Sequence, residues 1–178
     1  MTFLVRSIRK GLVPVSFAMV GVLSGCGGME SSMQDSSITN ADEASVAKMV
    51  ADWRWKHRLL VVAAGSPDTA FDRQWSAVAE LKAEWLDREL LLVMLTSSEG
   101  WIVEDPAAAR SASRHLTAGQ AMVFRNRFDL SREKFEAVLV GKDGGVKSRY
   151  FEVVDPTAVF PFIDSMPMRM DEMKKASE

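Results

Sequence analysis

Residues 135–150, FEAVLVGKDGGVKSRY, predict two β-strands joined by a tight turn. The almost unbroken apolar run over residues 135–140 is typical of a strand buried on both faces inside a sheet. Charged and uncharged side chains alternate over residues 146–150, which favours a strand nearer the sheet edge with one face in water. The Asp143-Gly144 pair suits the positive φ angles of a tight hairpin. We therefore expect a sheet built around this hairpin.

Length and composition indicate one globular domain with a tail. The chain has 178 residues, of which 47% are hydrophobic, and a formal charge of −2 at pH 7. This is enough apolar material for one core, and too short a chain for two ordinary domains. The charge balance lacks the basic stripe that binds nucleic acid, so we expect no nucleic-acid partner.

Residues 1–25 have the anatomy of a secretory signal peptide. Three basic residues precede an apolar run over residues 11–23, and small residues follow. The run is shorter than the roughly 20 apolar residues that span a bilayer. It ends in Leu23-Ser24-Gly25-Cys26, which resembles a bacterial lipoprotein lipobox. The resemblance implies cleavage before Cys26, diacylglycerol on its sulfur and anchorage in the membrane. The alternative is an ordinary signal peptide followed by a chance cysteine.

The residues after the lipobox bear on location and on chemistry. Gly27 resembles the sorting pattern of outer-membrane lipoproteins, so we expect the bacterial cell envelope, and in a Gram-negative cell the outer membrane facing the periplasm. Cys26 is the only cysteine, so its lipidation would leave no thiol for disulfides, thiolate catalysis or metal binding. The composition of residues 26–41 predicts a flexible tether, and residues 42–178 then form the domain.

Strands and helices alternate along the domain. Continuous apolar runs over residues 59–64 and 89–95 are typical of buried strands. The helix expected between them, over residues 70–87, implies parallel pairing through a right-handed crossover. A second helical region covers residues 107–127, the hairpin follows, and Asp155 caps a last helix. We expect an α/β fold with a mixed sheet of about four strands, in the order β-α-β-α-β-β-α, flanked by helices.

This order is thioredoxin-like, and three stretches resemble one family. They are residues 55–61 (WKHRLLV), 137–147 (AVLVGKDGGVK) and 162–169 (FIDSMPMR). They are similar to the thioredoxin-like domain of unknown function called P-DUDES, which occurs in bacteria and in animal sushi-repeat and matrix-associated secreted proteins. The resemblance extends over residues 52–173. It implies a thioredoxin-like fold, for which family-level speculation has favoured redox activity.

Two departures from the thioredoxin pattern argue against that activity in this chain. A thioredoxin carries its cysteines in the turn after the first strand and at the start of the next helix. The corresponding residues 65–70, GSPDTA, contain no cysteine. A thioredoxin also has a cis-proline just before the hairpin, where this chain has residues 132–135, REKF. We therefore expect no thiol–disulfide oxidoreductase activity.

The first candidate binding residues are Trp53, Trp55 and Arg58, which lie in the aromatic and basic segment WRWKHR. One interpretation is that the tryptophans cap the end of the sheet while the basic stems cover apolar surface. The other is recognition of an acidic partner, helped by cation–π contacts.

The second group of candidates is Ser66, Asp68, Thr69 and Lys134, around the start of the helix after the first strand and the loop before the hairpin. A helix N-terminus attracts anions, although Ser, Asp and Thr are also the ordinary capping residues of a helix. Serine hydrolysis is not expected, because neither histidine belongs to a nucleophile motif. The acidic loop over residues 99–105 lacks metal-ligand spacing, so we expect no metal and no cofactor.

These observations lead to two hypotheses of function. The first is a lipid-anchored module of the cell envelope, without redox cysteines, that binds a protein or polymer and is not an enzyme. The alternative is an enzyme of unrecognised chemistry in the thioredoxin-like cleft near residues 66–71 and Lys134.

Overall fold

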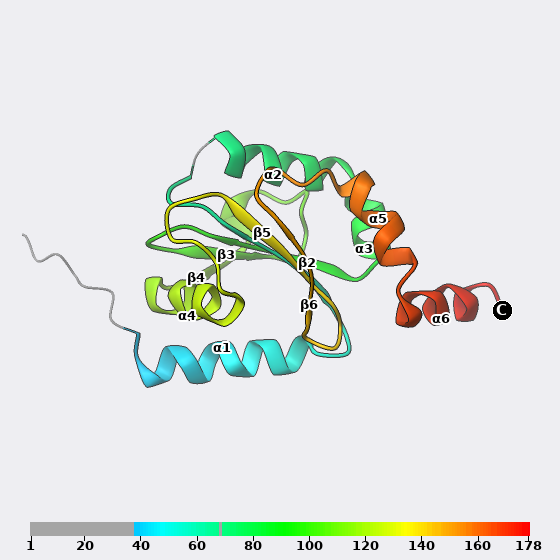
Figure 1. Cartoon of the computed structure of the whole chain (residues 1–178), viewed down its shortest axis with the longest axis horizontal. Helices are drawn as coiled ribbons and strands as arrows, with labels where there is room; N and C mark the ends of the chain where they lie inside the picture. Colours follow the sequence, from blue (N-terminus) through cyan, green and yellow to red (C-terminus); the bar gives the residue numbers. More distant parts are fainter. Residues whose placement is uncertain (1–37, 68) are drawn as a thin grey trace, which may run out of the picture. The chain divides into compact units, whose positions relative to one another are not determined.

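The computed structural model describes residues 38–67 and 69–178. The expected signal peptide, Cys26, most of the expected tether and Asp68 lie outside the described residues. Six strands of the described part form one mixed sheet in the order β4-β3-β2-β1-β5-β6 (Figure 1). The strands are β1 (Arg58–Ala63), β2 (Leu90–Leu95), β3 (Gly100–Val103), β4 (Arg114–Leu116), β5 (Glu136–Val140) and β6 (Val146–Tyr150).

The central strands are apolar because helices cover the sheet on both faces. β1, β2 and β5 are buried along their whole length. β1 pairs in parallel with β2 and antiparallel with β5, and β5 pairs antiparallel with β6 at the sheet edge. This confirms the predicted parallel pairing and the hairpin, and the order β2-β1-β5-β6 is thioredoxin-like. Gly144 has the positive φ, at 83°, while Asp143 is not in the positive-φ region, so the turn differs in detail from the tight hairpin expected.

The sheet has two strands more than the four expected. β3 is a four-residue apolar segment that pairs with β2, and β4 is a three-residue segment that pairs with β3. Two of the three β4 side chains are exposed, so its sequence shows no hydrophobic alternation from which a strand could be predicted. The helix expected over residues 107–127 is therefore wrong in its first half, where the chain forms a 3-10 turn, η1 (Arg110–Ala112), and then β4.

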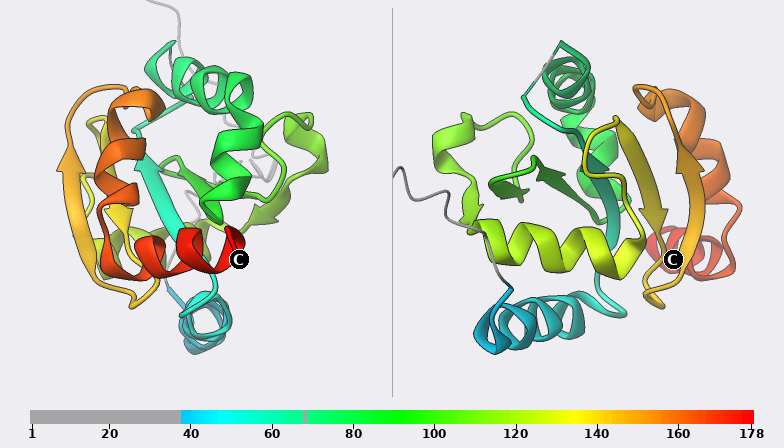
Figure 2. Two further views of the ribbon diagram at one scale, coloured as in Figure 1. Left: turned by 90° about the vertical axis from the view of Figure 1, so that its right-hand side faces the viewer. Right: turned by 60° about the vertical axis from the view of Figure 1, so that its left-hand side comes forward.

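Helices lie on both faces of the sheet (Figures 1 and 2). They are α1 (Asn40–Trp53), α2 (Thr69–Glu80), α3 (Lys82–Asp87), α4 (Ala118–Phe128), α5 (Pro156–Asp164) and α6 (Pro167–Ala176). α1 and α4 lie side by side and pack on the face that receives Leu59 and Val61 of β1. α2, α3 and α5 pack on the opposite face, which receives Leu60 and Val62. Alternate residues of one strand thus enter two separate cores.

Local sequence signals set the ends of these helices. Asp155 accepts a hydrogen bond from the Thr157 N–H and begins α5, as predicted. The helix expected over residues 70–87 is two helices, α2 and α3, which meet at Leu81. α6 differs from the other helices because Arg169 is its only buried residue. Charged groups therefore have to hold α6 in place.

Candidate functional site

The carboxyl ends of β1 and β2 are filled by the side chain of Arg125 on α4. This side chain is 2% exposed. Its guanidinium donates hydrogen bonds to the carbonyl oxygens of Ala64 (2.5 Å), Leu95 (3.0 Å) and Thr96 (3.2 Å), and also to that of Ser131. Burial, with Arg132 nearby, lowers the pKa of Arg125 to about 10, so the group stays cationic at neutral pH.

The same end of the sheet is closed by a contact between two main-chain segments. A Cβ atom placed on Gly65 would lie 2.7 Å from the carbonyl oxygen of Glu133. The loop before β5 therefore lies directly against the turn after β1, at the place that corresponds to the thioredoxin cysteines and cis-proline. Only glycine permits this approach, because a side chain would meet backbone that cannot move aside.

The structure brings together the segments that carry Ser66, Thr69 and Lys134 at this closed end. All three side chains are exposed, and Lys134 is held by its main-chain N–H, which donates to the Ser131 hydroxyl at 3.1 Å. Thr69 begins α2. In the described part of the chain, no group of three or more His, Asp or Glu side chains is placed to hold a metal ion.

Trp53, Trp55 and Arg58 lie at the opposite end of β1, and the structure gives them three different environments. Trp53 is half-buried and stacks on Phe124 of α4, with ring centroids 6.0 Å apart. Trp55 is 56% exposed, with the Arg54 guanidinium 5.0 Å from its ring centroid. Its φ of 69° is rare for a bulky side chain. Of the two tryptophans, only Trp55 therefore presents an exposed aromatic surface. Arg58 is buried.

Arg58 and Lys142 hold the carboxylate of Glu172 between them. Arg58 is 1% exposed and donates to Glu172 through both terminal nitrogens, at 3.1 and 3.2 Å, and to the Arg88 carbonyl at 3.1 Å. The Lys142 ammonium donates to Glu172 at 2.6 Å and also to Glu89. Burial raises the pKa of Glu172, but the hydrogen bonds from Lys142 and Arg58 lower it more, so the net shift is downward. The pair therefore holds an ionised carboxylate.

A second set of charges holds the start of α6. Arg169 donates to Asp164 at 3.2 Å, to the Asp87 carbonyl at 2.8 Å and to the Asp87 carboxylate. Asp164 also accepts from Arg88 at 2.5 Å. Burial raises the pKa of Asp164, but its hydrogen bonds to Arg88 and Arg169 lower it below the ordinary value. These contacts explain how a helix with few apolar contacts is docked.

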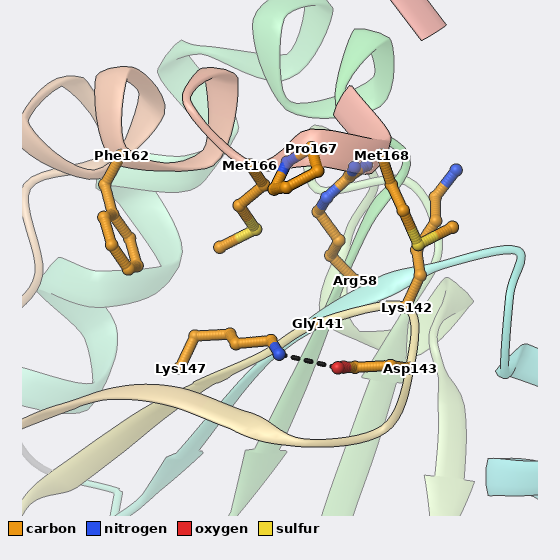
Figure 3. Close-up of a pocket in the computed structure, with 9 residues that line it drawn as sticks. All are labelled: Arg58, Gly141, Lys142, Asp143, Lys147, Phe162, Met166, Pro167 and Met168. Atoms are coloured by element: carbon orange, nitrogen blue, oxygen red, sulfur yellow. Dashed lines mark hydrogen bonds and ion pairs between the residues drawn. The ribbon is translucent and has the colours of Figure 1, made fainter. Parts of the chain in front are cut away.

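A cavity of about 340 Å³ lies beside Arg58, between the α5–α6 junction and the β5–β6 turn (Figure 3). Phe162, Met166 and Met168 reach into it from the helices, and Lys147 and Asp143 line it from the hairpin, joined by an ion pair of 2.6 Å. Its full lining is Arg58, Gly141, Lys142, Asp143, Lys147, Phe162, Met166, Pro167 and Met168.

Sequence reasoning selected Arg58 but missed Arg125, Lys142 and Glu172. A signal for Arg125 was present, because it lies four residues after Ala121 and three before Phe128 on the buried face of one helix. Lys142 and Glu172 carry no such signal, since a turn lysine and a glutamate near the C-terminus are ordinarily solvated.

Residues 49–172 match the family described as Domain of unknown function (DUF4174). Coiled-coil domain-containing protein 80 of Danio rerio is 30% identical over 138 residues, which cover 72% of this chain and 16% of that protein. Sushi repeat-containing protein SRPX2 is 27% identical in Rattus norvegicus and 26% in Homo sapiens, in each case over 140 residues that cover 78% of this chain and 29% of the relative. The chain therefore spans less than a third of the length of these relatives.

Among solved structures, the chain is similar to a thioredoxin peroxidase I of Plasmodium yoelii. The TM-score is 0.49 at 11% sequence identity, and the match covers 72% of this chain and 80% of the other.

Proposed function

The chain belongs to the family described as Domain of unknown function (DUF4174), and we propose that within it this protein is a non-catalytic binding module anchored by lipid in the bacterial cell envelope. The observation that supports the absence of catalysis is the closed carboxyl end of β1. Arg125 and the contact of Gly65 with Glu133 fill the place where a thioredoxin-like enzyme carries its reactive groups. An enzyme needs room for a substrate beside its reactive groups, and here the chain itself takes that room.

The proposed anchor is the lipid on Cys26. It is supported by the order of basic segment, apolar run and lipobox, and by the absence of any other cysteine from the sequence. Within residues 38–67 and 69–178, no helix combines the length and the apolar character needed to cross a bilayer. Cys26→Ser is expected to abolish labelling of the full-length chain by a clickable palmitate analogue. Equal labelling of both chains would refute the anchor.

The proposed binding surface is centred on Trp55. Its ring is exposed and has Arg54 above it, and Lys56 beside it is exposed as well. An exposed aromatic ring with two cations matches an acidic partner, because the ring supplies contact area and the cations supply complementary charge. Trp53 does not belong to this surface, since it packs on Phe124.

Photo-crosslinking in cells tests the surface. A benzophenone amino acid at position 55 of the full-length chain is expected to give one adduct of defined mass. The same probe at position 151, where Phe151 is 71% exposed, serves as the control and is expected to give none. Lys56→Glu is expected to reduce the adduct, whereas Lys48→Glu, on the exposed side of α1, leaves it unchanged. Equal adducts at both positions would contradict the proposal.

The enzyme alternative has its own test in the same cells. It requires Ser66, Thr69 or Lys134 to act on a small molecule, so replacing all three residues by alanine would make the cells resemble a deletion of the gene. We expect the triple variant to behave as wild type, because all three side chains are exposed.

A further inference from the structure

The cavity beside Arg58 combines an apolar wall with groups that attract an anion. Phe162, Met166, Pro167 and Met168 form its apolar wall. A Cβ atom on Gly141 would lie 2.5 Å from Cε of Lys147, so the glycine lets the Lys147 side chain lie close against the turn. A volume of about 340 Å³ lies within the range of ligand pockets. It holds on the order of ten heavy atoms, at the roughly 30 Å³ that a water molecule takes in the liquid.

One buried donor in the cavity wall has no hydrogen-bond partner within the described residues. The terminal nitrogens of Arg58 donate hydrogen bonds to Glu172 and to the Arg88 carbonyl, but its Nε–H has no partner in the part of the chain that is described. The side chain rises along the cavity beside Met166 and Pro167 (Figure 3). A buried N–H left unpaired costs about 1–3 kcal/mol, so an acceptor placed in the cavity would recover a contact that the protein by itself does not make.

The N-terminus of α6 opens at the same place. This helix has ten residues, begins with Pro167, and its cap residue Met166 gives no side-chain hydrogen bond to the first turn. The N-terminal end of a helix carries a partial positive charge and free N–H groups, which bind carboxylates and phosphates. The helix end and the Arg58 Nε–H are two independent features that favour the same kind of ligand atom.

The carboxylates near the cavity are already paired. Glu172 is held by Arg58 and Lys142, and Asp143, which lines the hairpin side, is paired with Lys147. Glu89 also pairs with Lys142, so three carboxylates balance the three cations Arg58, Lys142 and Lys147. The attraction for an anion therefore comes from the Arg58 Nε–H and the N-terminus of α6. An anion without an apolar part would leave the Met and Phe wall uncovered.

We propose that this cavity binds an anionic amphiphile, with a carboxylate or phosphate head at the Arg58 Nε–H and the α6 N-terminus, and an apolar tail against Phe162, Met166 and Met168. The site goes beyond the proposed function, because it requires neither the lipid anchor nor the envelope partner. The cavity size limits the ligand to a head with a tail of medium length.

Methyl NMR of the full-length chain in neutral maltoside micelles tests the site, with octanoate and octyl phosphate as probes. The Met166 and Met168 methyl signals are expected to shift saturably, whereas the signal of Met94, which is buried in β2, stays in place. 1-Octanol tests the head, since it has a tail of the same length and no charge. Acetate and inorganic phosphate test whether the apolar tail is required, because they carry the charged head alone. Which of the two charged probes binds more tightly distinguishes a carboxylate ligand from a phosphate ligand.

Variants that leave the core intact distinguish binding in the cavity from nonspecific binding of the amphiphile to the protein or the micelle. Phe162 is 44% exposed and Lys147 lies on the edge strand, so Phe162→Glu and Lys147→Glu are expected to fold. Phe162→Glu places a carboxylate in the wall that holds the tail, and Lys147→Glu replaces a cation of the lining by an anion, so each is expected to weaken binding about tenfold. Lys48→Glu is the matched control, because Lys48 forms an i,i+4 ion pair on α1 like that of Lys147 in the hairpin.

Three results would overturn the proposal. The first is the absence of a saturable shift at Met166 and Met168 with either charged probe. The second is binding of 1-octanol as tight as that of octanoate, which would remove the anion site. The third is equal affinity of Lys147→Glu and Lys48→Glu, which would place the ligand elsewhere. None of these results bears on crosslinking at position 55, so this inference and the proposed function fail separately.

Discussion

Replacing Arg125 by methionine is expected to lower the free energy of unfolding by about 3–5 kcal/mol. The guanidinium donates to four carbonyl oxygens, and one of them, that of Leu95, keeps a second donor in the Ala64 N–H at 2.9 Å. Each buried carbonyl left without a donor costs about 1–3 kcal/mol. Methionine also removes the cost of burying a charge, which offsets part of the loss.

Urea unfolding of the full-length chain, followed by tryptophan fluorescence, measures this loss. Arg127→Met is the matched control, because Arg127 is on the same helix and exposed, with its guanidinium 6.0 Å from the Phe128 ring centroid. The control is expected to change the free energy of unfolding by less than about 0.5 kcal/mol. A loss below about 1 kcal/mol for Arg125→Met would refute the idea that Arg125 holds this end of the sheet closed.

Two further predictions concern the contacts at the two ends of β1. Gly65→Ala is expected to lower the free energy of unfolding by about 1–3 kcal/mol in the same urea experiment, because its Cβ would lie 2.7 Å from the Glu133 carbonyl oxygen. Gly145→Ala is the control, since its Cβ would have contacts of 3.5 Å or more. Equal losses for the two variants would contradict the close approach at Gly65. The ion pair with Lys142 helps to keep the pKa of Glu172 below its ordinary value of 4.5, so its contribution is present above that value and is lost as the pH falls through the folded pKa. Hydrogen exchange of α6, corrected for intrinsic rates and compared with α4, is therefore expected to quicken from pH 6 to pH 3, and an unchanged ratio would show that these charges do not dock the helix.

The centre of the fold follows from local patterns in the sequence. β1, β2 and β5 are short, continuous apolar runs, and the helices between them have an apolar face, so their order and pairing are predictable. β3 and β4 are not predictable in the same way, because four and three residues are too few to establish a period. Their strand structure depends on pairing with a neighbour, β3 with β2 and β4 with β3.

The candidate site depends on contacts between distant parts of the sequence. Arg58 ends an aromatic and basic segment, which makes it a candidate from the sequence, but its partner Glu172 is 114 residues further along the chain. The separation of Trp53 from Trp55 is likewise tertiary. Both occur in one hexamer, yet Trp53 packs on Phe124 and Trp55 adopts a positive φ that turns the chain into β1. No local pattern distinguishes the buried tryptophan from the exposed one.

The two ends of β1 each bury an arginine, and the way each arginine is satisfied decides which end is available to a ligand. At the carboxyl end, Arg125 is surrounded by carbonyl oxygens of its own chain, and main chain presses on main chain at Gly65. At the amino end, Arg58 is held by a carboxylate of α6, has one donor without a partner among the described residues, and faces an apolar cavity. A binding site requires both free space and a group whose interactions are incomplete. The carboxyl end is filled by the chain itself, so the end near Arg58 is where a ligand gains a contact that the folded chain lacks.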